Sequence, residues 1–134
     1  MLLEIDHHSG QPIYRQVMEQ IRRQILAGQL AEGEQLVSVR GLAGRLKVNP
    51  MTISKAYGLL EMEGLLERRR GVGLFVAGLE QEQKSASKGE LLERILGKAV
   101  AAAVQFGISE EEVKRLTERL FERYGSAIRR DEHE

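Results

Sequence analysis

The stretch VNPMTISKAYGLLEMEGLLERRRGVGLFV, residues 48–76, contains the clearest structural signals of the chain. Asn49 is a favoured N-cap residue and Pro50 suits the first helical position, so the sequence predicts a helix that begins here. Gly64 ends this helix. Its buried face is predicted to consist of residues that recur at helical spacing, namely Ile53, Ala56, Tyr57 and Leu60.

A short β-hairpin is predicted directly after this helix. Residues 65–68 and 73–77 are predicted to form two strands, and residues 69–72 the turn between them. Three consecutive arginines, Arg68 to Arg70, lie at the tip of this hairpin. A cationic hairpin tip suits contact with phosphates or entry into a minor groove.

A second, shorter helix is predicted after Ser38, which is a good N-cap residue. Leu42, Ala43 and Leu46 form its inner face, and only three or four residues separate its end from the helix that begins at Asn49. A turn of that length is typical of a helix-turn-helix, which presents its second helix to the major groove of DNA. With the hairpin behind it, the region predicts a winged helix-turn-helix.

The N-terminal region supplies a further helix of this domain. Apolar residues recur every four positions from Pro12 to Ala27, and Gly28 ends the pattern. Pro12 is expected at the first helical position. Between this helix and Ser38, we expect a loop with at most one short strand near Gln35–Leu36.

Two more helices are predicted in the C-terminal part, from Glu90 to Phe106 and after Ser109, which forms a capping box with Glu112. Two helices cannot bury both of their apolar faces by themselves. We therefore expect pairing with a second copy of the chain, in preference to packing against the chain's own N-terminal domain. The predicted dimerisation residues are Leu92, Ile95, Leu96, Ala99, Val100, Ala103, Val113, Leu116, Leu120 and Phe121.

The fold class predicted from these elements is mainly α with a small β-wing: a winged helix-turn-helix followed by a two-helix C-terminal dimerisation segment. The predicted division is a DNA-binding domain at 1–78, a linker at 79–89, a helical dimerisation segment at 90–126 and a flexible tail at 127–134. The linker and the helical segment differ in composition. The residues of the linker are mostly polar or small, whereas the helical segment is rich in leucine and alanine.

Composition excludes several classes of function. The 134 residues include no cysteine, so disulfides, zinc–thiolate sites and thiol nucleophiles are excluded. His7 and His8 lack a nearby third ligand, and no grouping of serine, histidine and carboxylate suggests catalysis, so we expect no metal, no cofactor and no enzyme. The N-terminus lacks the apolar run of a signal peptide, and no stretch approaches the roughly 20 apolar residues that span a bilayer. We expect a cytoplasmic protein without a membrane partner.

Charge is balanced over the whole chain, with 20 basic and 20 acidic residues, but it is unevenly distributed. Residues 40–70 contain seven basic side chains and three acidic ones. A local basic patch of this kind is compatible with a polyanionic partner, such as double-stranded DNA.

Together with Pro12-Ile13-Tyr14 and residues 36–43, the stretch 48–76 closely resembles the GntR family of transcription regulators. The resemblance covers roughly residues 9–78 and involves several ordered motifs at fixed spacing. The short C-terminal part and the Asn49-Pro50 helix start are similar to the YtrA-like subfamily. The chain departs from the common family pattern at Val37, Gly41, Pro50-Met51 and Leu74.

The resemblance implies which residues contact DNA. Arg40 matches an arginine near the start of the second helix that contacts DNA in such proteins, residues 49–55 match the start of the recognition helix, and Arg70 and Gly71 match the tip of the wing. The predicted DNA-binding set is Ser38, Arg40, Asn49, Met51, Thr52, Ser54, Lys55, Arg69, Arg70 and Gly71.

The chemistry of these residues supports DNA contact independently. Arginine binds guanine O6 and N7 bidentately, and the hydroxyls of Thr52 and Ser54 bond phosphates or bases. Free main-chain N–H groups at the start of the helix that Asn49 caps are expected to favour a phosphate. Met51 either contacts a thymine methyl or is simply an exposed helix residue, and both interpretations stay open.

These observations lead to two hypotheses. The first is a homodimeric, sequence-specific transcription regulator that binds a palindromic operator and represses a transporter operon or its own operon. The second is a winged-helix adaptor that binds proteins through its C-terminal helices without specific DNA binding. The arginines of the wing favour the first hypothesis. The operator sequence, the regulated genes, the choice between repression and activation, and the identity or existence of a small-molecule effector stay open.

Overall fold

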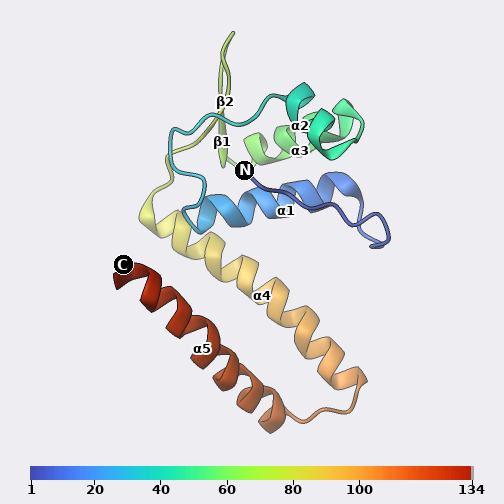
Figure 1. Ribbon diagram of the computed structural model, residues 1–134, viewed down its shortest axis with the longest axis vertical. Coiled ribbons are helices and arrows are strands. Elements are labelled where there is room, and N and C mark those ends of the chain that lie inside the picture. Colours follow the sequence, from blue (N-terminus) through green and yellow to red (C-terminus); the bar gives the residue numbers. More distant parts are fainter. Residues whose placement is uncertain (134) are drawn as a thin grey trace. The chain divides into compact units, whose positions relative to one another are not determined.

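The chain forms five α-helices and one two-stranded antiparallel sheet over the described residues 1–133 of a computed structural model (Figure 1). Side chains are described except at 81, 82 and 126–133. The elements are α1 (Ile13–Leu26), α2 (Val39–Leu46), α3 (Pro50–Met62), β1 (Leu66–Arg69), β2 (Gly73–Val76), α4 (Gln81–Gln105) and α5 (Glu110–His133). The chain divides into two compact units, Met1–Ser87 and Lys88–Glu134. The predicted fold class, mainly α with a small β-wing, is confirmed.

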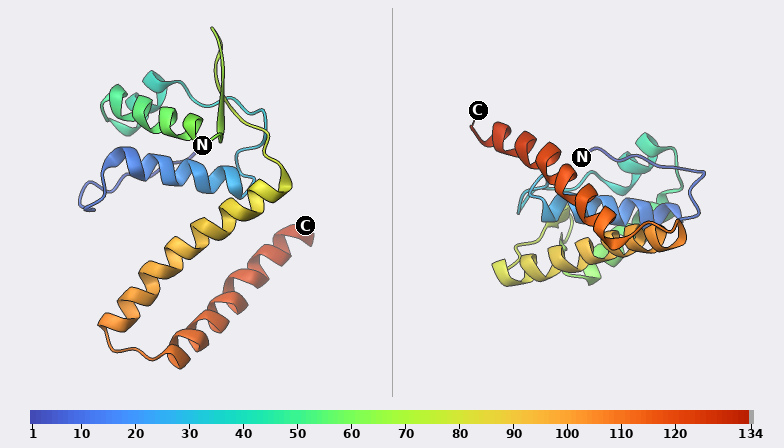
Figure 2. Two further views of the ribbon diagram at one scale, coloured as in Figure 1. Left: turned by 180° about the vertical axis from the view of Figure 1, so that it is seen from behind. Right: turned by 90° about the horizontal axis from the view of Figure 1, so that it is seen from below.

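A cluster of α1, α2 and α3 makes up most of the first unit (Figure 2). Helix α3 packs against both α1 and α2. Its inner face is the predicted one, since Ile53, Ala56 and Leu60 have no exposed surface. Fully burying a leucine or isoleucine side chain stabilises the fold by about 1.5–3 kcal/mol. The inner face therefore anchors α3 and leaves its other face open.

Short polar residues fix the starts of α2 and α3. The hydroxyl oxygen of Ser38 accepts a hydrogen bond from the N–H of Gly41 at 3.0 Å, and Oδ1 of Asn49 accepts one from the N–H of Met51 at 2.9 Å. Both N-caps are those that the sequence predicts. Pro12 lies one position earlier than predicted, as the N-cap of α1 with an extended ψ of 146°.

The hairpin of β1 and β2 projects from the helical cluster (Figure 1). The strands pair antiparallel, from Leu66 opposite Val76 to Arg69 opposite Gly73. Gly71 lies in the turn with a φ of 77°, a left-handed conformation that glycine adopts without steric cost. The predicted wing is therefore present, with its strand boundaries shifted by one residue.

The loop before α2 adds a further partner to this sheet. Gln35 forms an isolated bridge with Phe75, and the N–H of Leu36 donates to the carbonyl oxygen of Leu74 at 2.8 Å. The sequence predicted a loop with at most one short strand at this place, and the structure has a loop with an isolated bridge. The loop therefore fixes the base of the wing close to the residues that precede α2.

The structure corrects two predicted boundaries in the C-terminal part. Helix α4 begins at Gln81, so nearly all of the predicted linker at 79–89 is helical. Helix α5 continues to His133 through the predicted tail at 127–134, whose last residue lies outside the described part of the chain. Glutamine, glutamate, lysine and alanine are strong helix formers, and a single interior glycine costs only about 1 kcal/mol. The polar composition that suggested a linker therefore also suits a solvent-exposed helix.

The N-terminal arm, residues 1–6, is attached to α1 by a ladder of glutamines. Side chains of Gln16, Gln20 and Gln24 hydrogen-bond the backbone of alternate arm residues. Gln20, for example, accepts from the N–H of Glu4 at 2.9 Å and donates to its carbonyl oxygen at 2.7 Å. Four residues of helix rise about 6 Å, close to the advance of two residues in an extended strand. Every fourth residue of α1 therefore lies beside every second residue of the arm.

Candidate nucleic-acid interface

The first turn of α3 is open on the side away from the core. Met51 is 78% exposed, Ser54 and Lys55 are also exposed, and Thr52 is half-buried. Asn49 is exposed at the start of the helix. The predicted recognition residues therefore share an open helix face, with Thr52 partly covered.

The main-chain donors at the start of α3 are already used, which corrects one expectation. Pro50 has no N–H, the N–H of Met51 donates to the Asn49 side chain at 2.9 Å, and that of Thr52 donates to the Asn49 carbonyl oxygen at 2.9 Å. Free N–H groups were expected to favour a phosphate here. Because the N–H groups of Met51 and Thr52 are already bonded to Asn49, contact of these two residues with a partner falls to their side chains.

A hydrogen bond from α3 fixes the backbone just before the start of α2. The hydroxyl of Tyr57 donates to the carbonyl oxygen of Val37 at 2.7 Å, directly before Ser38. Burial raises the pKa of Tyr57 to about 12, against an opposing effect of the Arg45 charge, so the hydroxyl keeps its proton at neutral pH. Arg40 lies exposed in the first turn of α2. The hydroxyl hydrogen of Ser38 also stays available, since its oxygen is the cap acceptor.

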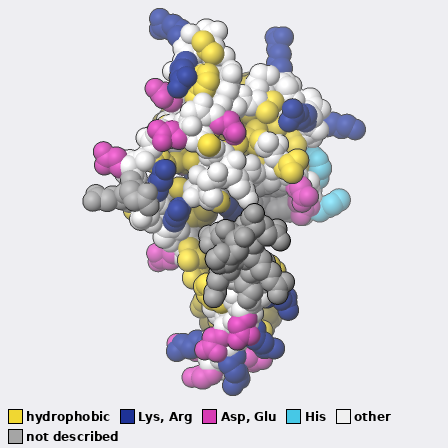
Figure 3. Space-filling view, turned by 60° about the vertical axis from the view of Figure 1, so that its left-hand side comes forward, with side chains coloured by type: hydrophobic (Ala, Val, Ile, Leu, Met, Phe, Trp, Pro, Cys, Tyr) yellow, Lys and Arg dark blue, Asp and Glu magenta, His cyan; other side chains and the backbone are white. Residues whose placement is uncertain are grey.

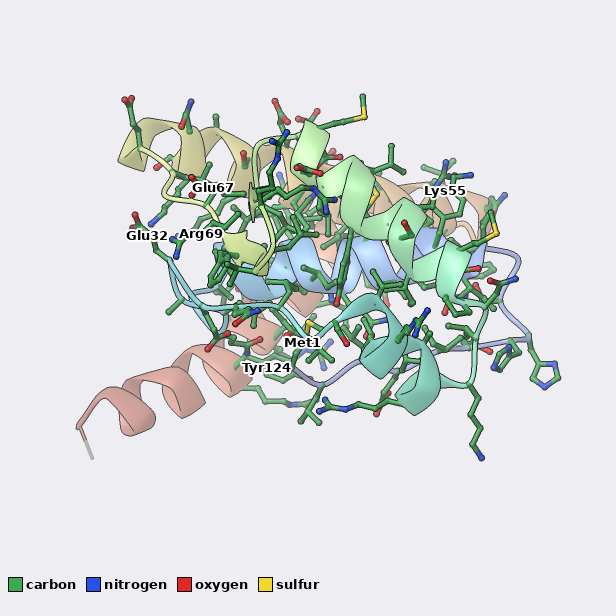
Figure 4. All side chains as sticks on the ribbon, turned by 90° about the horizontal axis from the view of Figure 1, so that it is seen from above. Met1, Glu32, Lys55, Glu67, Arg69 and Tyr124 are labelled. Atoms are coloured by element: carbon green, nitrogen blue, oxygen red, sulfur yellow. The ribbon has the colours of Figure 1, made fainter. Side chains whose placement is uncertain are left out.

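Lys55 has an aromatic partner within the domain. Its Nζ lies 3.9 Å from the centre of the Tyr14 ring, on α1. A cation over an aromatic face gains about 0.5–1 kcal/mol at an exposed site. Figure 4 shows Lys55 on α3 well apart from Arg69 on the hairpin. The ring of Tyr14 thus holds the ammonium group at the edge of the open face of α3.

Arg68 does not belong to the free hairpin tip that the sequence predicted. Its Nε donates to Oε2 of Glu61 at 3.2 Å and its Nη2 donates to Oε1 at 3.1 Å. The pair joins β1 to the last turn of α3. Two arginines, rather than three, therefore remain at the tip.

The other wing arginines have different surroundings. The guanidinium of Arg69 lies 4.0 Å above the centre of the Phe75 ring, and Phe75 is itself buried. Arg70 and Gly71 are exposed at the turn. Stacking on a ring leaves the N–H edges of a guanidinium available, which suits contact with phosphate oxygens.

Basic side chains gather on the projecting part of the first unit. Figure 3 shows Lys and Arg on the hairpin at the top of the view, with acidic side chains lower on the same face. Among the described residues, no group of three His, Cys, Asp or Glu side chains is arranged to hold a metal ion. None of the helices described over 1–133 is both long enough and apolar enough to cross a membrane.

The second unit keeps most of the predicted dimerisation residues exposed. Seven of them are at least two-fifths exposed: Leu92, Ile95, Leu96, Val100, Leu116, Leu120 and Phe121. Ala99 is also exposed, Val113 is half-buried and Ala103 is buried. Val104, Phe106 and Tyr124 are further exposed apolar residues. The two helices thus do not cover this apolar face between themselves.

Sequence reasoning missed the partners of the basic residues. Glu61 precedes Arg68 by seven positions across a helix end, and Tyr14 is 41 positions from Lys55. Each contact joins two different elements, so the periodicity within one helix or strand does not report it. They depend on how α1, α3 and the hairpin pack.

The comparisons with known proteins agree with this geometry. Residues 13–76 match the family model of bacterial regulatory proteins of the gntR family. The HTH-type transcriptional repressor YtrA of Bacillus subtilis is 33% identical over 84% of this chain and 86% of its own length. A GntR family transcriptional regulator from Listeria monocytogenes has a TM-score of 0.73 at 27% identity, covering 86% of this chain and 98% of its own.

A solved complex with DNA is also similar. The AraR DNA-binding domain in complex with operator ORX1 has a TM-score of 0.51 at 32% identity, covering 56% of this chain and 96% of its own. These relatives are transcription regulators rather than enzymes. The match over the winged domain and the identity to a relative of similar length lead to one conclusion: the chain belongs to the GntR family of bacterial transcriptional regulators.

Proposed function

We propose that this protein is a sequence-specific DNA-binding repressor that acts in the cytoplasm on a transporter operon or on its own operon. The observation that carries the proposal is the open first turn of α3, which is anchored from behind by Ile53, Ala56 and Leu60. A helix presented in this way fits the major groove of DNA. The similarity to YtrA, a repressor by name, supports repression, and AraR supports operator binding.

The proposed DNA contacts fall into two classes. Arg40, Met51 and Thr52 are assigned to base recognition, because their side chains are suited to base edges or methyl groups. The remaining assigned residues contact phosphates and position the protein without reading sequence. These residues are Ser38, Asn49, Ser54, Lys55, Arg69, Arg70 and Gly71.

We further propose that two copies pair through the exposed apolar face of α4 and α5. An apolar face of this breadth on a monomer is costly in water, because about 25 cal/mol is gained for each Å² removed from it. Pairing related by a two-fold axis presents two recognition helices to one side of the DNA. The operator is then a palindrome whose half-sites lie about 10 bp apart, or a multiple of that distance.

The test is a binding assay on the DNA upstream of the protein's own operon, with a random duplex as the reference. The wild-type protein is expected to prefer the upstream DNA, and Arg40→Ala is expected to lose about 1–3 kcal/mol of that preference. Arg23→Ala, which removes the same charge from α1, serves as the control. Equal affinity of the wild-type protein for both DNAs contradicts the proposal.

An adaptor function is less well supported. A protein-binding adaptor needs no arginines at the tip of a wing, whereas Arg69 and Arg70 are both exposed there. The similar proteins are named as transcriptional regulators or repressors. Absence of any salt-dependent DNA binding is the outcome that favours the adaptor.

A further inference from the structure

We propose that Glu61 is a positioning residue that keeps Arg68 away from the DNA backbone. The wing then offers two arginines to phosphates although the sequence contains three in a row. This inference rests on the proposed DNA-binding function. It concerns how strongly the protein binds DNA of any sequence.

The contact itself is a two-bond ion pair. Both oxygens of Glu61 accept from Arg68, at 3.1 and 3.2 Å, in the parallel arrangement that carboxylates and guanidinium groups favour. The Arg68 side chain is 59% exposed and that of Glu61 is 33% exposed. Ion pairs on a surface are usually weak, and this two-bond geometry is the arrangement that makes one effective. Because the pair is open to solvent, a phosphate is a realistic competitor for Arg68.

The strand geometry separates Arg68 from its neighbour. Successive side chains of a strand point to opposite faces, so Arg68 faces α3 while Arg69 stacks over Phe75 on the other face. Arg70 follows in the exposed turn. Glu61 therefore binds Arg68 and does not restrain Arg69 or Arg70.

The consequence is a lower affinity for DNA of any sequence. A phosphate contact adds affinity without sequence information, and each neutralised phosphate steepens the plot of log K against log salt by about 0.9. Releasing Arg68 adds one such contact. The ion pair between Glu61 and Arg68 removes this contact and so shortens the time that the protein spends on non-target sites. Such sites vastly outnumber the operators.

The experiment measures binding of the full chain to a random-sequence duplex over a series of salt concentrations. The variants are Glu61→Ala, the double variant Glu61→Ala with Arg68→Ala, and Glu67→Ala. Glu67 is exposed on β1, so its removal changes the net charge by the same amount without releasing Arg68. Thermal unfolding of each variant shows that the fold is kept.

Glu61→Ala is expected to steepen the slope by about 0.9, and the double variant is expected to return to the wild-type slope. Glu67→Ala is expected to stay near the wild-type slope. Two results overturn the inference: a wild-type slope for Glu61→Ala, or a double variant about 0.9 shallower than wild type, which means that Arg68 already binds DNA. A wild-type protein without salt-dependent binding overturns the proposed function as well.

Discussion

The hydroxyl of Tyr57 on the inner side of the recognition helix donates a 2.7 Å hydrogen bond to the carbonyl oxygen of Val37, one residue before the N-cap of α2. The bond links the two helices of the helix-turn-helix through a buried residue. It therefore sets how Arg40, on α2, lies relative to the open turn of α3.

Tyr57→Phe is expected to lower the free energy of unfolding by about 1 kcal/mol, because the Val37 carbonyl loses its partner while the ring still fills the core. Urea unfolding measures this loss. Tyr57→Leu, which also removes the ring, is expected to cost more. Equal stability of wild type and Tyr57→Phe contradicts the prediction.

The stability of the protein is expected to fall in alkaline solution through Tyr57. Its pKa is 10 in an unfolded chain and about 12 when buried, so folding favours the protonated hydroxyl. That contribution is complete below pH 10 and is lost as the pH rises from 10 to 12. Unfolding curves across this range measure the loss. Tyr57→Phe lacks the titrating group, so a wild-type protein that loses no more stability than this variant contradicts the assignment.

Gln20→Ala is expected to loosen the N-terminal arm. The substitution removes two hydrogen bonds to the backbone of Glu4, which lowers the free energy of unfolding by about 1 kcal/mol. Hydrogen exchange at the Glu4 amide is the more direct measurement and is expected to become faster. Glu19→Ala, one position earlier and outside the ladder, is the control. Unchanged exchange at Glu4 in Gln20→Ala rules out the ladder.

Lys47→Gly is expected to stabilise the protein. Lys47 is the C-cap of α2 and has a φ of 57°, which costs a residue with a Cβ about 1–2 kcal/mol. Glycine removes this cost but makes the unfolded chain more flexible, so the net gain is about 0.5 kcal/mol. Lys47→Ala removes the same charge and keeps the Cβ, so it is expected to show no gain. Thermal unfolding of both variants separates backbone strain from charge.

Val100→Glu is expected to separate the proposed dimer. Val100 is 50% exposed on α4, and a charge at this position is costly to bury against a second copy. Sedimentation is expected to show a dimer for wild type and a monomer for the variant. Lys98→Glu, on the same helix outside the apolar face, is expected to stay dimeric. If wild type itself sediments as a monomer, the proposed pairing is wrong.

The helix-turn-helix was predictable because local chemistry specifies it. Ser38 and Asn49 satisfy the donors at two helix starts, and the burial of Ile53 and Leu60 follows from helical spacing. These signals act within a few residues of the chain. The same is true of the wing, whose turn requires the conformational freedom of Gly71.

The rest of the candidate site was not predictable, because it depends on packing. That Arg68 contacts Glu61 depends on how the hairpin packs against α3. The sequence did not predict the start of α4 at Gln81, because a polar segment is compatible both with a linker and with a solvent-exposed helix. The glutamine ladder had a visible four-residue repeat, but its partner was an arm without a pattern of its own.

The capped start of α3 has a consequence for how such a regulator changes its target. Pro50 brings no N–H, and Asn49 accepts hydrogen bonds from the N–H groups of Met51 and Thr52, so these residues offer a partner their side chains. The position of main-chain N–H groups is fixed by the path of the chain. Exposed side chains, in contrast, can be replaced by mutation without disturbing the helix that carries them. If the proposed function holds, substitution at Met51 or its neighbours changes the operator that is bound and leaves the scaffold intact.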